Sequence, residues 1–337
     1  YVISAPGHYR IPLVYGNAIE NGATNANAYI SHAPTGNSNV LYNFQDHAGH
    51  AIDNPWIEKT HGGANAGVNG AKLVWADEAN LFHLAAGSAA ISHDAAGNAY
   101  LQLEVRASDI KSGNAVVAAT KDGTVVWSWH LWFAPQSALT PIEVTNHQGV
   151  KYNFTTETVG WKPTKWEGTV YQSPRSVKFR VEQTIANNGK KQYTDITITQ
   201  KPGNKREGIV TLYQFGNKNA YPGTDDNLVG SFNIDLQIHI TVPEIIQNPQ
   251  KYYPTTNMFP HVNSWAADDI TGGYSDNPVI KTVYDPSPVG FKMPASNAFT
   301  GFTSDGKLQS DNDKINADFP RDFQQYKDNY GHNFWTN

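Results

Sequence analysis

Hydrophobic and polar positions alternate most clearly in the stretch VVWSWHLWF at residues 125–133. Side chains along a strand alternate between the two faces of its sheet. One face of this stretch carries Trp127, Trp129, Leu131 and Phe133. A face so uniformly large and apolar belongs in a core. The preceding run at 113–123 is also strand-like and ends in Asp-Gly, a favoured turn. The pattern therefore predicts a β-hairpin over 114–133.

The opposite face of the same predicted strand is mixed. It carries Val126, Ser128, His130 and Trp132. Trp132 is the only large aromatic ring among these smaller or polar side chains. Its position makes it a candidate for ligand binding.

The rest of the chain predicts a mainly β protein in three parts. Short strand-like runs separated by turn residues indicate a β-sandwich over 1–135. Residues 136–201 contain the alternating runs KFRVEQTI and TDITITQ with the turn NNGK between them. This part is either a small β unit or the opening of the last domain. In 202–337 strand signals thin out, and aromatic-rich loops dominate.

Composition and charge narrow the function classes. The net charge is −5 and no basic stripe is present, so nucleic-acid binding has no electrostatic support. No apolar run approaches the roughly 20 residues that span a bilayer, so we expect no transmembrane segment. The chain has no cysteine, which excludes disulfides, thiolate metal sites and cysteine catalysis. No sequence motif frames a catalytic nucleophile or acid pair, and we expect no enzyme.

Several distinctive segments occur in one order along nearly the whole chain. They are YVISAPGHYRIPLVYGNAI, GNAVVAATKDGTVVWSWHLWF, EVTNHQGVKYNF, LYQFGNKNAYPG, IIQNPQKYY, KTVYDPSPVGFKMPASNAFTGF and YGHNFWTN. The chain resembles fimbrillin-like surface proteins of the Bacteroidetes that carry the Fibrobacter-type major paralogous domain. This resemblance implies an N-terminal β-sandwich and a loop-rich α+β domain similar to C-type lectins and formylglycine-generating enzymes. It also implies an extracellular protein, anchored in the outer membrane or associated with a pilus, and it brings no residue-level site.

The chain departs from this family in two places. Ser287 stands where many relatives have cysteine, and formylglycine-generating chemistry needs cysteines that this chain lacks. Relatives also continue beyond the position of Asn337. The resemblance therefore implies that the C-terminal end of the lectin-like domain is missing: either the chain was cleaved, or the rest is not in this sequence.

Two clusters of polar residues are weak candidates for a metal site. His47 and His50 would share a face if they lay on a helix. Asp305, Asp311 and Asp313 offer the oxygen ligands that calcium prefers. Neither cluster has the spacing of a known ligand set, so we expect no metal and no organic cofactor.

Exposed aromatic rings are the most suitable binding tools, because the flat faces of sugars stack on indole rings. The candidates are Trp132, Trp161, Trp166, Trp265 and Trp335. Each is also well suited to cover a loop or a core. We therefore expect a non-catalytic adhesin module that contacts other pilus or cell-envelope proteins. The alternative is a lectin-like module that binds surface glycans.

Overall fold

The computed structural model describes residues 1–31, 44–164, 175–186, 188–200, 208–214, 216–224, 226–237, 240–253, 264–267 and 275–302. The fold is mainly β, as the sequence predicts. Its two α-helices in the described part are short, α1 (Thr60–Gly63) and α2 (Val242–Gln247). Neither is long and apolar enough to cross a membrane.

The chain divides into two compact units. Unit 1 comprises Tyr1–Trp161 and Val210–Asn337, and unit 2 comprises Lys162–Ile209. The boundaries after 135 and 201 that the sequence suggests stay predictions.

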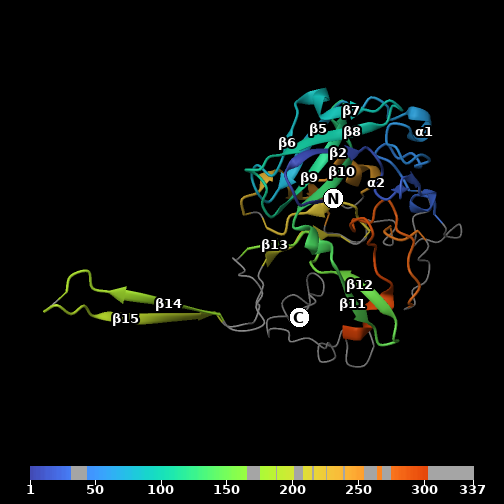
Figure 1. Cartoon of the computed structure of the whole chain (residues 1–337). Coiled ribbons are helices and arrows are strands. Elements are labelled where there is room, and N and C mark those ends of the chain that lie inside the picture. The colour runs from blue at the N-terminus through green and yellow to red at the C-terminus, as the bar shows by residue number, and fades with distance from the viewer. Residues whose placement is uncertain are drawn as a thin grey trace. The chain divides into compact units, whose positions relative to one another are not determined.

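The largest sheet of unit 1 has five strands in the order β1-β10-β9-β5-β19 (Figure 1). The strands are β1 (Val2–Ile3), β10 (Thr124–Phe133), β9 (Gly113–Lys121), β5 (Gly70–Ala76) and β19 (Val229–Gly230). The predicted hairpin is confirmed as β9 and β10. Its turn residues Asp122 and Gly123 have φ values of 49° and 84°, the left-handed conformation that a two-residue hairpin turn requires.

A β-bulge between Val125 and Trp127 shifts the register of β10 against β9. Because of the extra residue, Val126 and Trp127 both pack into the main core, and Val125 packs into a second cluster on the opposite face of the sheet. The predicted position of Val126 on the mixed face is therefore wrong. Trp127 and Trp129 are 1% and 7% exposed, which confirms their predicted burial.

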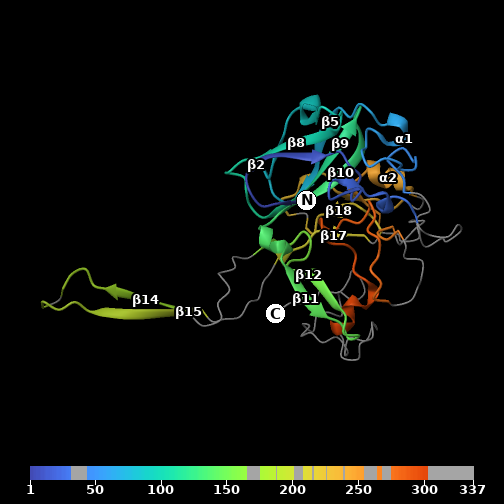
Figure 2. The same ribbon diagram turned by 45° about the vertical axis from the view of Figure 1, so that its right-hand side comes forward.

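A second sheet of unit 1 shares this core (Figure 2). It consists of β2 (Gly7–Pro12), β8 (Ala99–Val105) and β6 (His83–Leu84), with β7 (Ile91–His93) also paired to β8. Every second residue of β8 is buried, and Leu101 and Leu103 meet Leu131 and Phe133 of β10 in one hydrophobic cluster. Apolar residues stand at every second position of AYLQLEV, so they all lie on the face of β8 that packs into the core.

Late segments of the chain complete unit 1. Ile246 of α2, together with Val283 and Tyr284, joins the main core. The remaining strands of this unit are β3 (Ile19–Glu20), β4 (Ala23–Thr24), β11 (Pro141–Thr145), β12 (Lys151–Thr155), β17 (Leu212–Tyr213), β18 (Ala220–Tyr221), β20 (Asn233–Ile234) and β21 (Lys251–Tyr252). Its 3₁₀-helices are Ala26–Ala28, Gly87–Ala90, Gln136–Leu139 and Ser296–Phe302.

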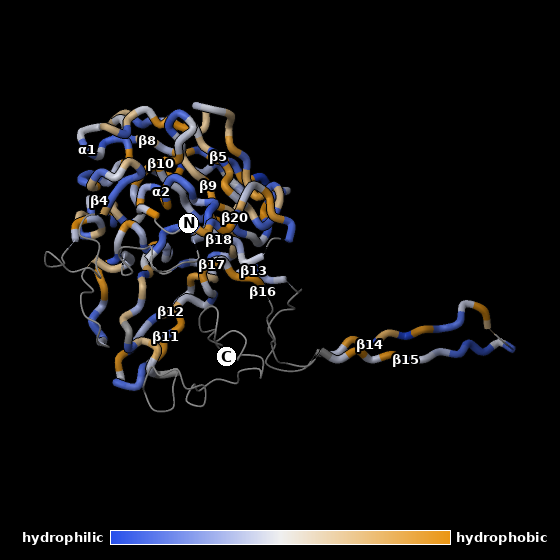
Figure 3. The backbone as a smooth tube through the Cα atoms, turned by 180° about the vertical axis from the view of Figure 1, so that it is seen from behind, coloured by the Kyte–Doolittle hydropathy of each residue, from blue (hydrophilic) through white to orange (hydrophobic). Residues whose placement is uncertain are grey.

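Unit 2 consists of two antiparallel strand pairs. The short pair is β13 (Lys162–Pro163) with β16 (Gly208–Ile209). The long pair is β14 (Arg175–Glu182) with β15 (Tyr193–Gln200), which matches the strands predicted from alternation. Hydrophobic and hydrophilic residues alternate along both long strands (Figure 3).

Candidate functional site

One face of the β14–β15 pair is apolar and exposed. We call it the apolar ribbon face, and it consists of Val177, Phe179, Val181, Ile196 and Ile198. Each of these side chains is between 49% and 60% exposed. Val177 lies opposite Ile198, and Phe179 lies opposite Ile196, so the rings and branched chains form cross-strand pairs. A two-stranded ribbon with one apolar face is marginally stable alone and gains stability when that face is covered.

The other face of the ribbon is polar and internally paired. Asp195 accepts hydrogen bonds from Arg180 and forms an ion pair with Lys178, at 2.9 Å in each case. These two cations lower the pKa of Asp195. Arg180 also lies over the Tyr193 ring, 3.9 Å from its centroid. These contacts hold the two strands in register and leave the opposite face for packing.

A cavity of about 260 Å³ lies beside β10 in unit 1. We call it the Lys218 cavity. Its walls come from residues 1–2, 16–17, 127–130, 281 and 283–289, together with Gln136, Leu139 and Lys218. These segments are far apart in the sequence, and the fold brings them together at the outer edge of β10.

Lys218 has only neutral polar neighbours in this cavity. Its Nζ donates to Ser128 Oγ at 2.7 Å and to Asn219 Oδ1 at 3.0 Å, and it lies 4.5 Å from the centroid of the Trp127 ring. No carboxylate of the described residues lies within ion-pair distance of it. Burial lowers the pKa of Lys218 to about 7, because the charged form loses its hydration.

Lys281, the second lysine of the cavity wall, is paired. Its Nζ lies 3.3 Å from Asp285 Oδ1 and donates to the Ser287 carbonyl at 2.8 Å. Burial lowers the pKa of Lys281, and the neighbouring carboxylate opposes that shift. The cavity wall therefore holds two lysines and one aspartate.

His130 lies beside Lys218 on the cavity wall and is held by neutral partners. Its Nε2 hydrogen-bonds Asn114 Oδ1 at 3.0 Å, and its Nδ1 hydrogen-bonds the Tyr213 hydroxyl. Asn114 in turn donates to Asp77 at 2.9 Å. Burial lowers the pKa of His130 well below its ordinary value, so this imidazole is neutral at pH 7.

Of the five candidate tryptophans, the structure describes Trp132, Trp161 and Trp265. Trp132 is 1% exposed, and its Nε1 donates to the Trp161 carbonyl at 2.9 Å. Trp161 packs against the same cluster. Trp265 packs against the main core and donates to the Asn217 carbonyl at 3.1 Å. Each of the three thus has a packing partner, and Trp166 and Trp335 lie outside the described residues.

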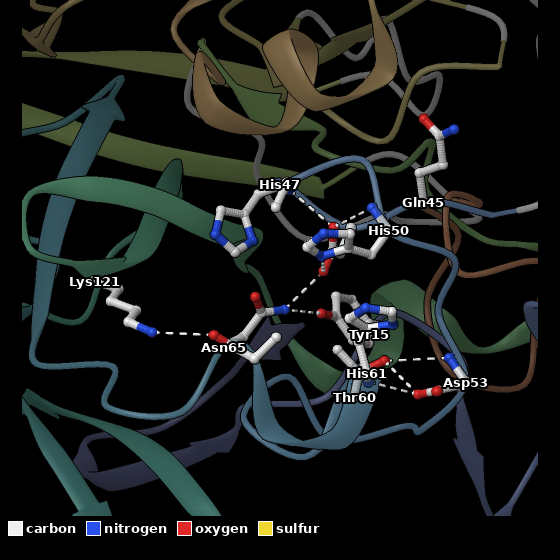
Figure 4. A network of polar contacts seen from close by, with 12 residues as sticks. Tyr15, Gln45, His47, His50, Asp53, Thr60, His61, Asn65 and Lys121 are labelled. Atoms are coloured by element: carbon white, nitrogen blue, oxygen red, sulfur yellow. Dashed lines mark hydrogen bonds and ion pairs between the residues drawn. The ribbon is translucent and has the colours of Figure 1, made fainter.

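His50 contacts Asp46 through its backbone N–H at 2.9 Å, and His61 donates its backbone N–H to Asp53 at 2.7 Å (Figure 4). The ring nitrogen Nδ1 of His47 is buried without a hydrogen-bond partner among the described residues. The rings of His50 and His61 stack with centroids 4.3 Å apart. Asp46 Oδ1 accepts the backbone N–H groups of Ala48 and His50, and Asp46 Oδ2 accepts the Asn65 side-chain amide. Both carboxylate oxygens of Asp46 are therefore occupied. Across the described part of the chain, no three potential ligands gather into a group that would hold a metal. Asp305, Asp311 and Asp313 lie outside that part.

In comparisons with family models, curated proteins and solved structures, no match to this chain was found. The family resemblance based on the sequence segments stays a prediction.

Sequence patterns did not single out Lys218 or Ser128. Lys218 lies in the loop NKNAYPG, where hydrophobic periodicity carries no information. Ser128 was placed on the mixed face of β10, and a small hydroxyl on such a face is unremarkable by itself. One feature of the sequence could have indicated a site here: Ser128 and His130 are polar and lie on one face of the stretch VVWSWHLWF, whose other residues are apolar.

Proposed function

We propose that this chain is a non-catalytic adhesive module of a bacterial cell surface or pilus tip that acts by protein–protein contact. In this proposal it has the N-terminal β-sandwich and the lectin-like C-terminal domain that the sequence resemblance implies. The observation that carries the proposal is the apolar ribbon face. Five apolar side chains about half exposed on one sheet face are typical of a surface that another protein covers.

The partner that suits this ribbon best is a second copy of the chain. Residues 175–200 carry five Lys and Arg against two Asp and Glu, whereas the rest of the chain carries 20 against 28. A basic ribbon and an acidic remainder attract each other between copies, while two ribbons repel. The contact is therefore head-to-tail, and repetition of such a contact builds a linear assembly.

Unit 1 offers apolar side chains that such a contact would cover. Ile234 and Leu236 are 59% and 74% exposed. Between them lies Asp235, which is paired with Lys251 at 2.9 Å. Ile234 and Leu236 thus offer apolar surface that suits a contact with the apolar ribbon face.

Sedimentation of the full chain over about a hundredfold range of concentration tests the proposal. We expect the mass to rise with concentration and the association to weaken with added salt. The variant Phe179→Ser with Ile196→Ser should stay monomeric, and the control Ser176→Ala with Thr199→Ala, on the polar face, should associate like the parent. A parent chain that stays monomeric throughout, or a double serine variant that associates equally well, would overturn the proposal.

A further inference from the structure

We propose that the Lys218 cavity binds a small organic carboxylate, whose charge pairs with the Lys218 ammonium. This site lies wholly within unit 1 and does not depend on the ribbon contact. It can therefore fail or hold independently of the adhesive function.

The first argument is the missing counter-ion. Lys218 and Lys281 both line the cavity, but only Lys281 has a carboxylate, Asp285, at its side. Burying an ammonium is costly unless it is paired. Ser128 and Asn219 satisfy two of its three N–H donors and supply no negative charge. The Trp127 ring, 4.5 Å away, supplies no full negative charge either, so the charge of the ammonium is left for a ligand.

The second argument is a further donor at the same place. In β10 the amide of Trp132 and the carbonyl of His130 bond to Tyr1 on the outer edge of the sheet. Amide directions alternate along a strand, so the N–H of Ser128 points to that same edge. Among the described residues, the pairing of β1 with β10 covers Trp132 and Phe133. In this proposal the Ser128 amide assists the Lys218 ammonium as a second donor to the carboxylate.

The size and walls of the cavity indicate the rest of the ligand. A volume of about 260 Å³ lies just below the usual range for small-molecule sites, which indicates a ligand of a few heavy atoms. Leu139, Val283 and Pro288 contribute apolar surface to the walls. A monovalent acid with a short apolar or aromatic body suits one ammonium and these walls. A phosphate dianion would need a second free cation, and Lys281 is already paired.

Protonation of Lys218 accompanies binding. Since its pKa is about 7, the ligand must compete with deprotonation above that pH, and affinity falls as pH rises. The other groups facing the cavity are His130, Tyr284, the Lys281–Asp285 pair and the amino group of Tyr1. Burial lowers the pKa of His130 and raises that of Tyr284, so both are neutral near pH 7. Burial also lowers the pKa of the Tyr1 amino group to about 6, so pH dependence alone does not identify the cation.

Calorimetric titration of the full chain with acetate, isobutyrate and benzoate, each against its own amide, tests the proposal. The acid and its amide share shape and differ in charge. We expect at least one acid to bind about tenfold more tightly than its amide, a difference of about 1.4 kcal/mol. Inorganic phosphate and chloride are run as further probes. If no acid binds more tightly than its own amide, or if phosphate binds more tightly than every acid, the proposal is wrong.

Variants then locate the charge. Lys218→Met should abolish the preference for the acid, whereas the double variant Lys281→Met with Asp285→Asn, which removes the paired charges of the same wall together, should retain it. Lys218→Arg should retain part of the preference. A preference that survives Lys218→Met would overturn the assignment. The comparison of acid with amide in the unaltered protein keeps the proposal falsifiable even if Lys218→Met does not fold.

Discussion

The hydroxyl of Tyr284 forms two hydrogen bonds with the backbone of Gln45, 239 residues away in the sequence. It donates to the Gln45 carbonyl at 2.6 Å and accepts the Gln45 N–H at 2.9 Å. The ring packs beside Trp127 and Phe44 in the core. One side chain therefore fixes the loop around Gln45 to the last described segment of unit 1.

Replacing Tyr284 with phenylalanine removes both bonds and keeps the ring. Two backbone groups of Gln45 then lose their partner inside a part-buried site. We expect the free energy of unfolding to fall by about 1–3 kcal/mol. Urea denaturation measures this, with Tyr193→Phe on the exposed ribbon as the control. Equal stability of the two variants would show that water replaces the lost hydroxyl at Gln45.

Trp127 contacts two aromatic rings and one cation in the core. It meets Tyr15 edge-on with centroids 5.0 Å apart and lies under the Lys218 ammonium. Replacing it with alanine should cost about 3–5 kcal/mol of unfolding free energy. Phe179→Ala, which removes an exposed ring of the apolar ribbon face, should cost far less in the monomer. If the Trp127 variant melts with the parent, its assignment to the core is wrong.

Sequence patterns predicted the parts of this fold that depend on local alternation. The β9–β10 hairpin and the β14–β15 pair both follow from period-two patterns and a short turn. The bulge after Val125 was not predictable, because Val125 and Val126 are both apolar and suit either face of the sheet. The mixed face predicts a binding role for Trp132, but the ring is buried against Trp161, a residue of a separate loop that the pattern of β10 does not include.

The two candidate sites also differ in how far the sequence predicts them. The alternation of KFRVEQTI and TDITITQ predicts the apolar ribbon face. The same alternation is also found in strands whose apolar face is buried, so it does not predict that this face is exposed. The Lys218 cavity depends on a contact between residues 90 positions apart, in a strand and a loop. No periodicity relates such segments, so only the folded chain brings Lys218 to Ser128.

Gly16 shows how closely two distant segments approach at the cavity. Its φ is +32°, and a Cβ at this position would overlap the Val283 carbonyl oxygen. Gly22 also has a positive φ, of +78°, but a Cβ there meets nothing within 4 Å. Gly22→Ala should therefore lower the free energy of unfolding by about 1–2 kcal/mol, the cost of placing alanine in the left-handed conformation. Gly16→Ala should lower it clearly more, because the added Cβ also overlaps the Val283 carbonyl. Denaturation of both variants checks this, and equal losses would mean that the Val283 segment moves aside without cost.

The partly buried Lys218 makes the stability of the protein depend on pH in a defined direction. The pKa of Lys218 is about 7 in the folded protein and 10.5 when unperturbed. Between these values the unfolded chain binds more protons than the folded one, so the free energy of unfolding rises with pH. Below about pH 7 both states hold the proton, and the folded protein bears the cost of a partly desolvated ammonium.

Lys218→Met removes this contribution and leaves the other groups in place. The pKa of Lys281 is also lowered, but that lysine is present in both proteins, so its effect cancels in the difference. We expect the stability of the parent relative to Lys218→Met to increase steadily when unfolding is measured at about pH 6.5, 8 and 9.5. Buried tyrosines oppose the trend only above their ordinary pKa of about 10, outside this window. In the control Lys72→Met, which removes an exposed lysine, the free energy of unfolding should depend on pH in the same way as in the parent. A difference between parent and Lys218→Met that stays constant with pH would mean that Lys218 keeps its ordinary pKa, and that the cavity holds an ammonium already neutralised by other groups.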